Sequence, residues 1–220
     1  MRDAVWPELV GSAAVLVVPL GACEQHGPHL PLTTDADIAE GVAARLAAAR
    51  SDVVIAPVLA YGSSGEHAGF AGTLSIGFPV TQQLLVELGR SACETFSRVL
   101  FVSTHGGNAG AVGSAVEDLR WEKRDVRAWF PRWGGDAHAG RTETSLMLAL
   151  RPEAVRVGAA EAGRVEPVAS LMGELRSGGV SSVSQNGVLG DPSGATAAEG
   201  EALLVSAVAD LVSLLDAWTR

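Results

Sequence analysis

Short apolar runs alternate along this chain with longer segments in which apolar and polar residues follow a helical spacing. The run AAVLVVPLG is apolar at every position, which is typical of a strand buried on both faces of a sheet. The pattern predicts four such strands, over residues 13–21, 52–62, 98–108 and 125–133. Buried strands of this kind indicate a largely parallel sheet.

The segments between these runs predict helices. Ile38, Val42 and Leu46 recur at four-residue spacing in one of them, and Thr34 or Asp35 can cap its first turn. The predicted helices cover residues 33–50, 79–96, 109–124, 141–151 and 195–218. The stretch 153–194 is rich in glycine and serine, so we expect a long excursion that serves as an interface arm or as a lid.

Strands that alternate with helices predict an α/β fold with a mostly parallel central sheet covered on both faces. A length of 220 residues fits one domain over residues 1–220. Ligands of such sheets bind beyond the carboxyl ends of the strands. The loops that follow the strands are therefore where functional residues are expected.

The composition is that of a globular protein, with 47% hydrophobic and 19% charged residues. The formal net charge of -9 argues against nucleic acid and against an anionic membrane surface as partners. No apolar stretch approaches the roughly 18 residues that span a bilayer. Pro19 interrupts the N-terminal run, unlike in a signal peptide. Cys23 and Cys93 make no disulfide framework, which fits a cytoplasmic location.

Potentially reactive side chains follow the predicted strands. Glu24 and His26 come after the first strand, and Asp35 begins the next helix at the same edge. His105 follows the third strand and His138 the fourth, so we expect all of them to gather at one edge of the sheet. Imidazole and carboxylate without a thiolate cluster suit Zn, Mn or Fe(II), and one carboxylate, such as Asp35, can bridge two ions.

Three other segments indicate a function less clearly. His29 lies in GPHLP, where it either joins this group or packs in a proline-framed turn. His67 follows the second strand and is either a pocket residue or an ordinary loop residue. STHGGNAG is glycine-rich after a strand but lacks the Lys-Ser/Thr ending of a phosphate-binding loop, so nucleotide binding is not indicated.

Five segments resemble, in this order, the signature blocks of the creatininase (creatinine amidohydrolase) family. They are VPLGACEQHGPHLPLTTDADIAEGVAARLA, GEHAGFAGTLSIG, STHGGNAG, DAHAGRTETS and LGDPSGATAAEGEAL. The resemblance covers residues 14 to about 205. It implies a three-layer α/β/α fold, two divalent metal ions per chain, hydrolysis of amide-type C–N bonds and a homo-oligomer.

The resemblance also implies a set of metal ligands. The matching positions are Glu24, His26, Asp35 and His105, with Asp35 as the bridge. The sequence departs from creatinine amidohydrolases at Gly107, where those enzymes carry a metal-binding Glu. Glu143 is therefore the residue expected to complete the second metal position, and creatinine itself is a poor substrate candidate.

The expected chemistry is attack of a metal-activated water on the scissile carbonyl. His138 matches the catalytic histidine of the family and is expected to pass a proton to the leaving amine, helped by Glu143 or Asp136. The residues expected to bind substrate are Glu66, His67, Thr73, Trp133 and Asp136. Trp133, before Gly134-Gly135, either caps the pocket or packs at the end of its strand.

Within the family, DAHAGRTETSLMLAL and GVLGDPSGATAAEGE are most similar to the peptidase branch of mycofactocin biosynthesis. This resemblance implies a short modified precursor peptide as substrate and release of its cross-linked C-terminal Val-Tyr dipeptide. Two other hypotheses stay open. The same centre can hydrolyse a small cyclic amide or a formamide, and the chain can be a metal-binding scaffold without turnover.

Overall fold

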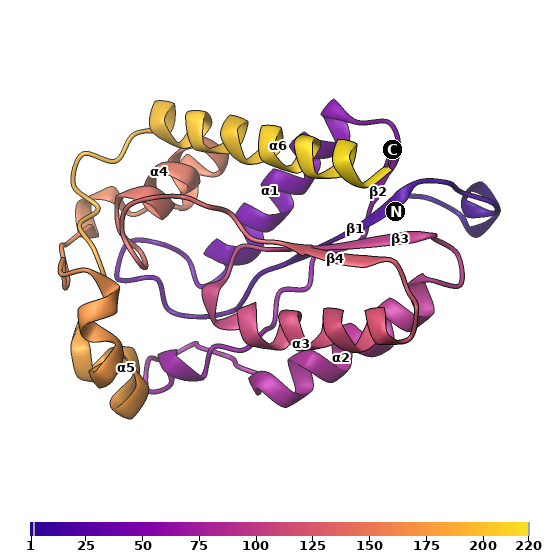
Figure 1. Cartoon of the computed structure of the whole chain (residues 1–220). Helices are drawn as coiled ribbons and strands as arrows, with labels where there is room; N and C mark the ends of the chain where they lie inside the picture. The colour runs from indigo at the N-terminus through magenta and orange to yellow at the C-terminus, as the bar shows by residue number, and fades with distance from the viewer. Residues whose placement is uncertain (2, 220) are drawn as a thin grey trace.

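The computed structural model describes residues 1 and 3–219, and within them it contains one four-stranded sheet (Figure 1). The strands are β1 (Val15–Leu20), β2 (Val53–Ile55), β3 (Arg98–Ser103) and β4 (Val126–Trp129). They lie in the order β2-β1-β3-β4, and every neighbouring pair is parallel. The predicted parallel sheet is confirmed.

All four strands are shorter than their predicted ranges, and β1 differs least. β2 ends at Ile55, and beyond it Leu59 pairs with β1 only as an isolated bridge. Pro57 has no backbone N–H to donate, which fits the break in this edge strand. β3 ends at Ser103 and β4 at Trp129, so the residues after them lie in loops.

Helices cover both faces of the sheet, which confirms the three-layer α/β/α architecture (Figure 1). One face carries α1 (Thr34–Ala49), α4 (Arg141–Leu150) and α6 (Ala197–Thr219), and the other carries α2 (Gly77–Ala92) and α3 (Ala109–Trp121). Alternate residues of β1 enter the two cores. Val15 and Val17 pack on the α1 side, and Leu16 and Val18 pack on the α2 side.

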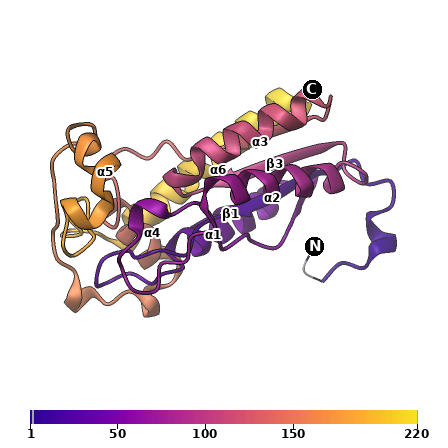
Figure 2. The same ribbon diagram turned by 90° about the horizontal axis from the view of Figure 1, so that it is seen from below.

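One helix lies outside these layers, in the segment where an irregular excursion was expected. α5 (Val168–Val183) stands apart at one end of the molecule and is kinked at Gly179 (Figures 1 and 2). Leu171, Val180 and Val183 are buried with Leu189 in a small apolar cluster, so tertiary contacts hold a segment of weak helix propensity. Single 3-10 turns occur at Trp6–Leu9, Gly65–His67, Gly106–Asn108, Pro152–Ala154 and Val157–Ala159.

α6 corrects one expectation from the sequence. By length and by its mean hydropathy of 1.6, it is a helix that could cross a membrane, whereas no apolar stretch of that length was expected. Its residues Leu204, Leu211 and Leu215 are fully buried in the core that α1 and α4 share. Asp210 of α6 accepts a hydrogen bond from Trp129 Nε1 at 2.7 Å. We therefore interpret α6 as a core helix of this fold.

The strand order places a crevice beside β1. The chain leaves β1 for β2 on one side and later enters β3 on the other side, and parallel sheets bind ligands where the order reverses in this way. A Cβ at Gly21 would lie 2.3 Å from Ala36 N, so this glycine allows α1 to start against the end of β1. Asn108 Nδ2 donates to Gly21 O at 2.9 Å, and Asn108 Oδ1 accepts from Ser63 N at 2.8 Å. These contacts join three loops at the crevice.

Candidate metal centre

Four groups of side chains at this crevice each offer three ligand atoms within 4.8 Å of one another, and two of these groups contain Asp35. Of these two, one is Glu24, Asp35 and His105, and the other is His26, Asp35 and Glu143. Asp35 belongs to both, because its Oδ1 lies 3.5 Å from His26 Nε2 and its Oδ2 lies 3.5 Å from His105 Nδ1. We call these five residues the metal-ligand cluster. One carboxylate between two sets of ligands is the arrangement of a dinuclear centre.

The members of the metal-ligand cluster come from separate segments. Glu24 and His26 follow β1, Asp35 lies in the first turn of α1, His105 follows β3 and Glu143 lies in the first turn of α4. The prediction that Thr34 or Asp35 caps α1 is wrong. Thr33 occupies the N-cap position, and its hydroxyl donates to Asp37. The Asp35 carboxylate instead faces the crevice.

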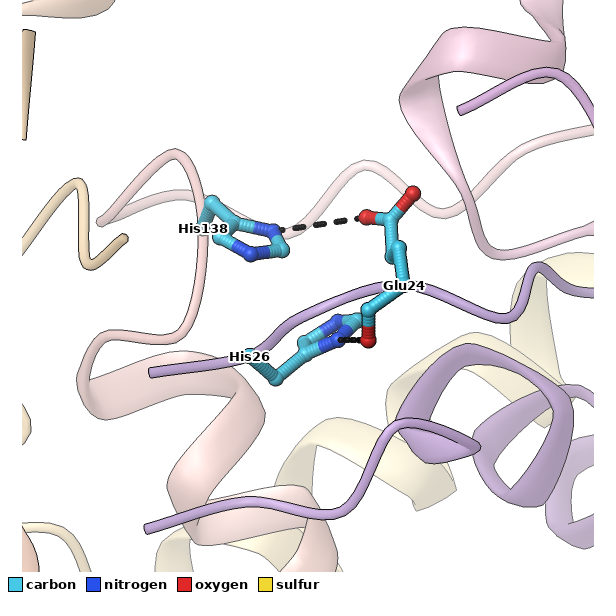
Figure 3. A group of neighbouring side chains, drawn as sticks. All are labelled: Glu24, His26 and His138. Atoms are coloured by element: carbon cyan, nitrogen blue, oxygen red, sulfur yellow. Dashed lines mark hydrogen bonds and ion pairs between the residues drawn. The ribbon is translucent and has the colours of Figure 1, made fainter. Parts of the chain in front are cut away.

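Backbone carbonyls determine which nitrogen each ligand histidine presents. His26 Nδ1 donates to Glu24 O at 3.2 Å (Figure 3). This leaves Nε2 facing Asp35 and Glu143. His105 Nε2 donates to Ser63 O at 2.9 Å, which leaves Nδ1 facing Asp35. Partners of this kind orient the histidines of metal sites and fix their tautomers.

The cluster contains buried polar atoms that the rest of the described chain leaves unsatisfied. Glu24 is fully buried, and neither of its carboxylate oxygens has a hydrogen-bond partner among the described residues. The same holds for Asp35 Oδ2 and His26 Nε2. An unpaired buried polar group costs about 1–3 kcal/mol, and more when it is charged. Oxygen and nitrogen atoms that converge in this way fit the divalent ions implied by the resemblance.

The surroundings of Glu24 and His26, two members of the cluster, raise the pKa values of both. Burial, and after it the charge of Asp35, raises the pKa of Glu24 to about 8. Burial acts to lower the pKa of His26, but the neighbouring carboxylates outweigh it, Asp35 above all, and raise this pKa to about 10. Protons therefore supply the positive charge that the carboxylates require, and a divalent ion that takes their place releases them.

His138 faces the cluster from the loop after β4. Its Nδ1 lies 3.7 Å from Glu24 Oε1 (Figure 3) and 4.0 Å from Glu143 Oε2. Its Nε2 donates to Gln25 O at 2.8 Å, so the lone pair is on Nδ1 and points toward the cluster. Burial, reinforced by the positive charge of His26, holds the pKa of His138 well below its usual range. The neutral ring can accept a proton at this atom.

Gln25 holds a second histidine in one tautomer. Its Oε1 accepts from Gly27 N at 2.8 Å and its Nε2 donates to Gly187 O at 3.0 Å, which fixes the orientation of the amide. The other hydrogen on Nε2 is donated to His67 Nδ1 at 2.9 Å. His67 therefore carries its proton on Nε2, 3.2 Å from Glu24 Oε1. Burial lowers the pKa of His67 to about 3, which keeps this donor neutral.

A cavity of about 730 Å³ opens on the metal-ligand cluster. His138 and members of the cluster form its floor, and Glu66 and His67 line one side, as expected from the sequence. Helix α5 supplies another side through four apolar residues, Val168, Met172, Leu175 and Val180, which we call the α5 wall. Arg176 adds one guanidinium to this side.

Three residues expected to bind substrate are not among those that line the cavity. Thr73 Oγ1 accepts from Gln25 N at 3.1 Å, and Trp133 packs against the core on the α1 side. Asp136 accepts from Arg141 N at the start of α4. These contacts fix loop and helix geometry, so the structure does not bring Thr73, Trp133 or Asp136 to the substrate side of the centre.

His29 lies apart from the predicted ligands, whereas two amide side chains without a predicted role lie among them. His29 hydrogen-bonds to Thr144 Oγ1 at 2.9 Å and lies outside both ligand groups, which matches the alternative that it packs in its turn. Gln25 and Asn108 were not singled out from the sequence, although each stands next to or near a predicted ligand. Gln25 lies beside Glu24 and Asn108 lies in HGGN, and these positions were the signals in the sequence that could have indicated their roles.

A parallel sheet between two layers of helices, with buried imidazole and carboxylate side chains at its crevice, is an arrangement that suits a metal-dependent hydrolase. A family profile for creatininase, described as creatinine amidohydrolase, matches residues 2–215. The chain belongs to the creatininase family, and it is a hydrolase of amide C–N bonds.

Two curated relatives carry the name mycofactocin precursor peptide peptidase. The protein of Mycobacterium tuberculosis is 49% identical over 99% of this chain and 91% of its own length. The protein of Mycolicibacterium smegmatis is 47% identical over 96% of this chain and 88% of its own length. Among solved structures, a mutant creatininase has a TM-score of 0.84 at 22% identity, over 100% of this chain and 99% of its own, which shows the fold. Other solved creatininases are named for a zinc pair or for manganese.

Proposed function

We propose that this chain is the peptidase that releases the modified C-terminal Val-Tyr dipeptide from the mycofactocin precursor peptide. The relatives at 47% and 49% identity that bear this name support the proposal. The observation that carries it is the cavity that joins the metal-ligand cluster to the α5 wall. A hydrolytic centre and an apolar surface for a Val-Tyr end thereby lie in one place.

The proposed cofactors are two divalent ions, Zn, Fe(II) or Mn. Glu24, Asp35 and His105 would hold one ion, and His26, Asp35 and Glu143 would hold the other, as the two ligand groups suggest. Such ions lower the pKa of water toward about 7 and polarise a scissile carbonyl.

His138 is the proposed proton carrier. Its Nε2–H is committed to Gln25 O, so the ring can accept a proton only at Nδ1, on the side of the cluster, and can then return it to the leaving amine. Glu143 Oε2, 4.0 Å from Nδ1, stabilises the imidazolium that forms. His67 offers its Nε2–H as a hydrogen-bond donor to the substrate.

The experiment that tests this function pairs a metal count with a cleavage assay. Purified protein is analysed for bound metals and then incubated with precursor peptide already cross-linked at its terminal Val-Tyr, and the products are followed by mass spectrometry. We expect about two metals per chain and loss of the terminal dipeptide. Protein stripped by a chelator is the control, and activity should return when the metal is restored.

The same assay separates the alternatives. Two metals without peptide cleavage would overturn the peptidase assignment, and turnover of creatinine or of a formamide under the same conditions would identify another branch of the family. Bound metal with no turnover of any of these compounds would indicate a scaffold. The cavity beside the cluster argues against a scaffold, because it gives water and substrate access to the metal position, and a structural site with all its coordination positions filled by protein has no use for such access.

The homo-oligomer and the cytoplasmic location stay predictions. Light scattering coupled to size-exclusion chromatography measures the number of chains in the particle. Leu74, Phe78 and Val80 expose apolar side chains near the start of α2, which is a surface that an assembly of several chains can cover.

A further inference from the structure

Gly107 leaves a space beside the metal-ligand cluster that the side chain of Glu66 fills. A Cβ built on Gly107 would lie 2.2 Å from Glu66 Oε1 and 2.4 Å from His105 Nε2. No side chain can therefore stand at residue 107 while Glu66 keeps this position. The carboxylate of Glu66 thus lies where a side chain of residue 107 would begin, although Glu66 belongs to another segment of the chain.

Glu66 also lies within reach of the cluster. Its Oε1 is 3.5 Å from His105 Nε2, and Glu24, Glu66 and His67 offer ligand atoms within 4.8 Å of one another. Both oxygens of the fully buried Glu24 lack a hydrogen-bond partner among the described residues. A buried carboxylate with a second carboxylate beside it favours the binding of a cation between them.

The backbone at Glu66 is held firmly, while its side chain keeps some freedom. A Cβ at Gly179 in the kink of α5 would lie 2.7 Å from Glu66 O, so α5 packs closely on this turn. Asn108 fixes the turn from the other side through Ser63 N. The Glu66 side chain is 36% exposed to the cavity, which leaves room for it to adjust to an ion.

We propose that Glu66 is a further protein ligand for the divalent ion that Glu24 helps to hold. Its carboxylate reaches this ion from the 3-10 turn Gly65–His67, through the space that Gly107 leaves open. This inference rests on the proposed metal centre. It changes the role of Glu66 from the substrate binding expected from the sequence to metal binding.

The test compares metal binding by Glu66→Gln with that of the wild type. Both proteins are stripped by a chelator and titrated with Mn²⁺, and free Mn²⁺ is followed by its electron paramagnetic resonance signal. We expect wild type to bind about two ions, and Glu66→Gln to keep one ion and bind the other at least ~10-fold more weakly. Glu161→Gln, an exposed carboxylate away from the cavity, is the matched control and should titrate as wild type does.

Two identical titrations, for wild type and for Glu66→Gln, would overturn the proposal and return Glu66 to a role in substrate binding. An equal loss in Glu161→Gln would also overturn it, because a general charge effect would then explain the result. If Glu66→Gln does not fold, Glu66→Asp retains the charge, and its second ion should bind more weakly than in wild type. Failure of peptide cleavage by wild-type protein would reject the peptidase and leave this metal result standing.

Discussion

The metal-ligand cluster and the α5 wall face the same cavity but are built in different ways. The cluster lies on loops and first helical turns attached to the sheet, and Glu24, His26 and Asp35 are 0%, 0% and 1% exposed. The α5 wall stands on a kinked helix outside the three layers, and Val168 is 43% exposed. One region is part of the core, and the other covers it from outside.

This difference separates two tasks. Metal ligands must converge to within a few tenths of an ångström, which requires residues fixed by packing and hydrogen bonds. Apolar contacts with a substrate are not directional and tolerate small shifts of the surface that makes them. We therefore expect changes in the cluster to abolish the reaction and changes in the α5 wall to alter the choice of substrate.

The strongest test of this comparison is Asp35→Ala. Because Asp35 belongs to both ligand groups, we expect loss of both ions and a fall in turnover of roughly 10³-fold or more, since water then keeps its own pKa of about 15.7. Elemental analysis and the peptide assay measure the two effects. Asp37→Ala is the control two residues along the same helix, where the carboxylate pairs with Arg151 instead. Retention of both metals by Asp35→Ala would contradict the shared role.

His138→Ala separates proton transfer from metal binding within the cluster region. We expect turnover to fall by ~10²–10⁴-fold with the metal content unchanged, because the ring acts on protons rather than on the ions. His29→Ala, which removes the histidine bonded to Thr144, should keep the rate of turnover. Full turnover by His138→Ala would show that another group moves the proton.

A smaller effect is expected from Leu175→Ala in the α5 wall. Loss of this apolar surface should raise KM for the peptide by roughly 10-fold, as expected for ~1–3 kcal/mol of hydrophobic contact, while kcat and metal content stay the same. Leu84→Ala on α2, an exposed leucine far from the cavity, is the matched control. A fall in metal content with Leu175→Ala would show that the two regions are not independent.

The smallest effect lies outside both regions. Hydrogen bonds from Arg90, and then from Arg124, hold the pKa of Glu122 at about 2, below its ordinary value of 4.5. A lowered pKa stabilises the fold above about pH 4.5, and this contribution disappears as the pH falls toward 2. Glu122→Gln should therefore lower Tm at pH 7 by at most ~4 °C and leave turnover unchanged. A constant Tm difference from pH 7 to pH 2 would contradict this origin.

The sequence predicted the regions in which local pattern and tertiary structure agree. β1 was predicted because its six residues are all apolar and all buried between two helical layers. Glu24, His26, Asp35 and His105 could be placed together because parallel strands end at one edge of the sheet. The roles assigned to these residues stay predictions until metals are counted in the variants.

The sequence did not predict the features that depend on loop conformation. α5 was missed because Gly173, Gly178 and Gly179 weaken its helix propensity, and contacts with the rest of the molecule decide its structure. Trp133 was placed at the substrate because it precedes Gly134-Gly135, and Asp136 because it lies close to His138 in sequence. The loop between β4 and α4 directs them elsewhere, to the core and to the start of α4.

If two ions bind as proposed, Asp35 makes their uptake a linked equilibrium. Each ion changes the charge and orientation of the carboxylate that the other ion uses, so binding of the first alters the affinity for the second by the same factor in either order. The fraction of chains with a complete pair is then not the square of the mean occupancy. When metal is scarce, the amount of active protein can be plotted against the metal concentration. The steepness of that curve should measure the coupling between the two ions.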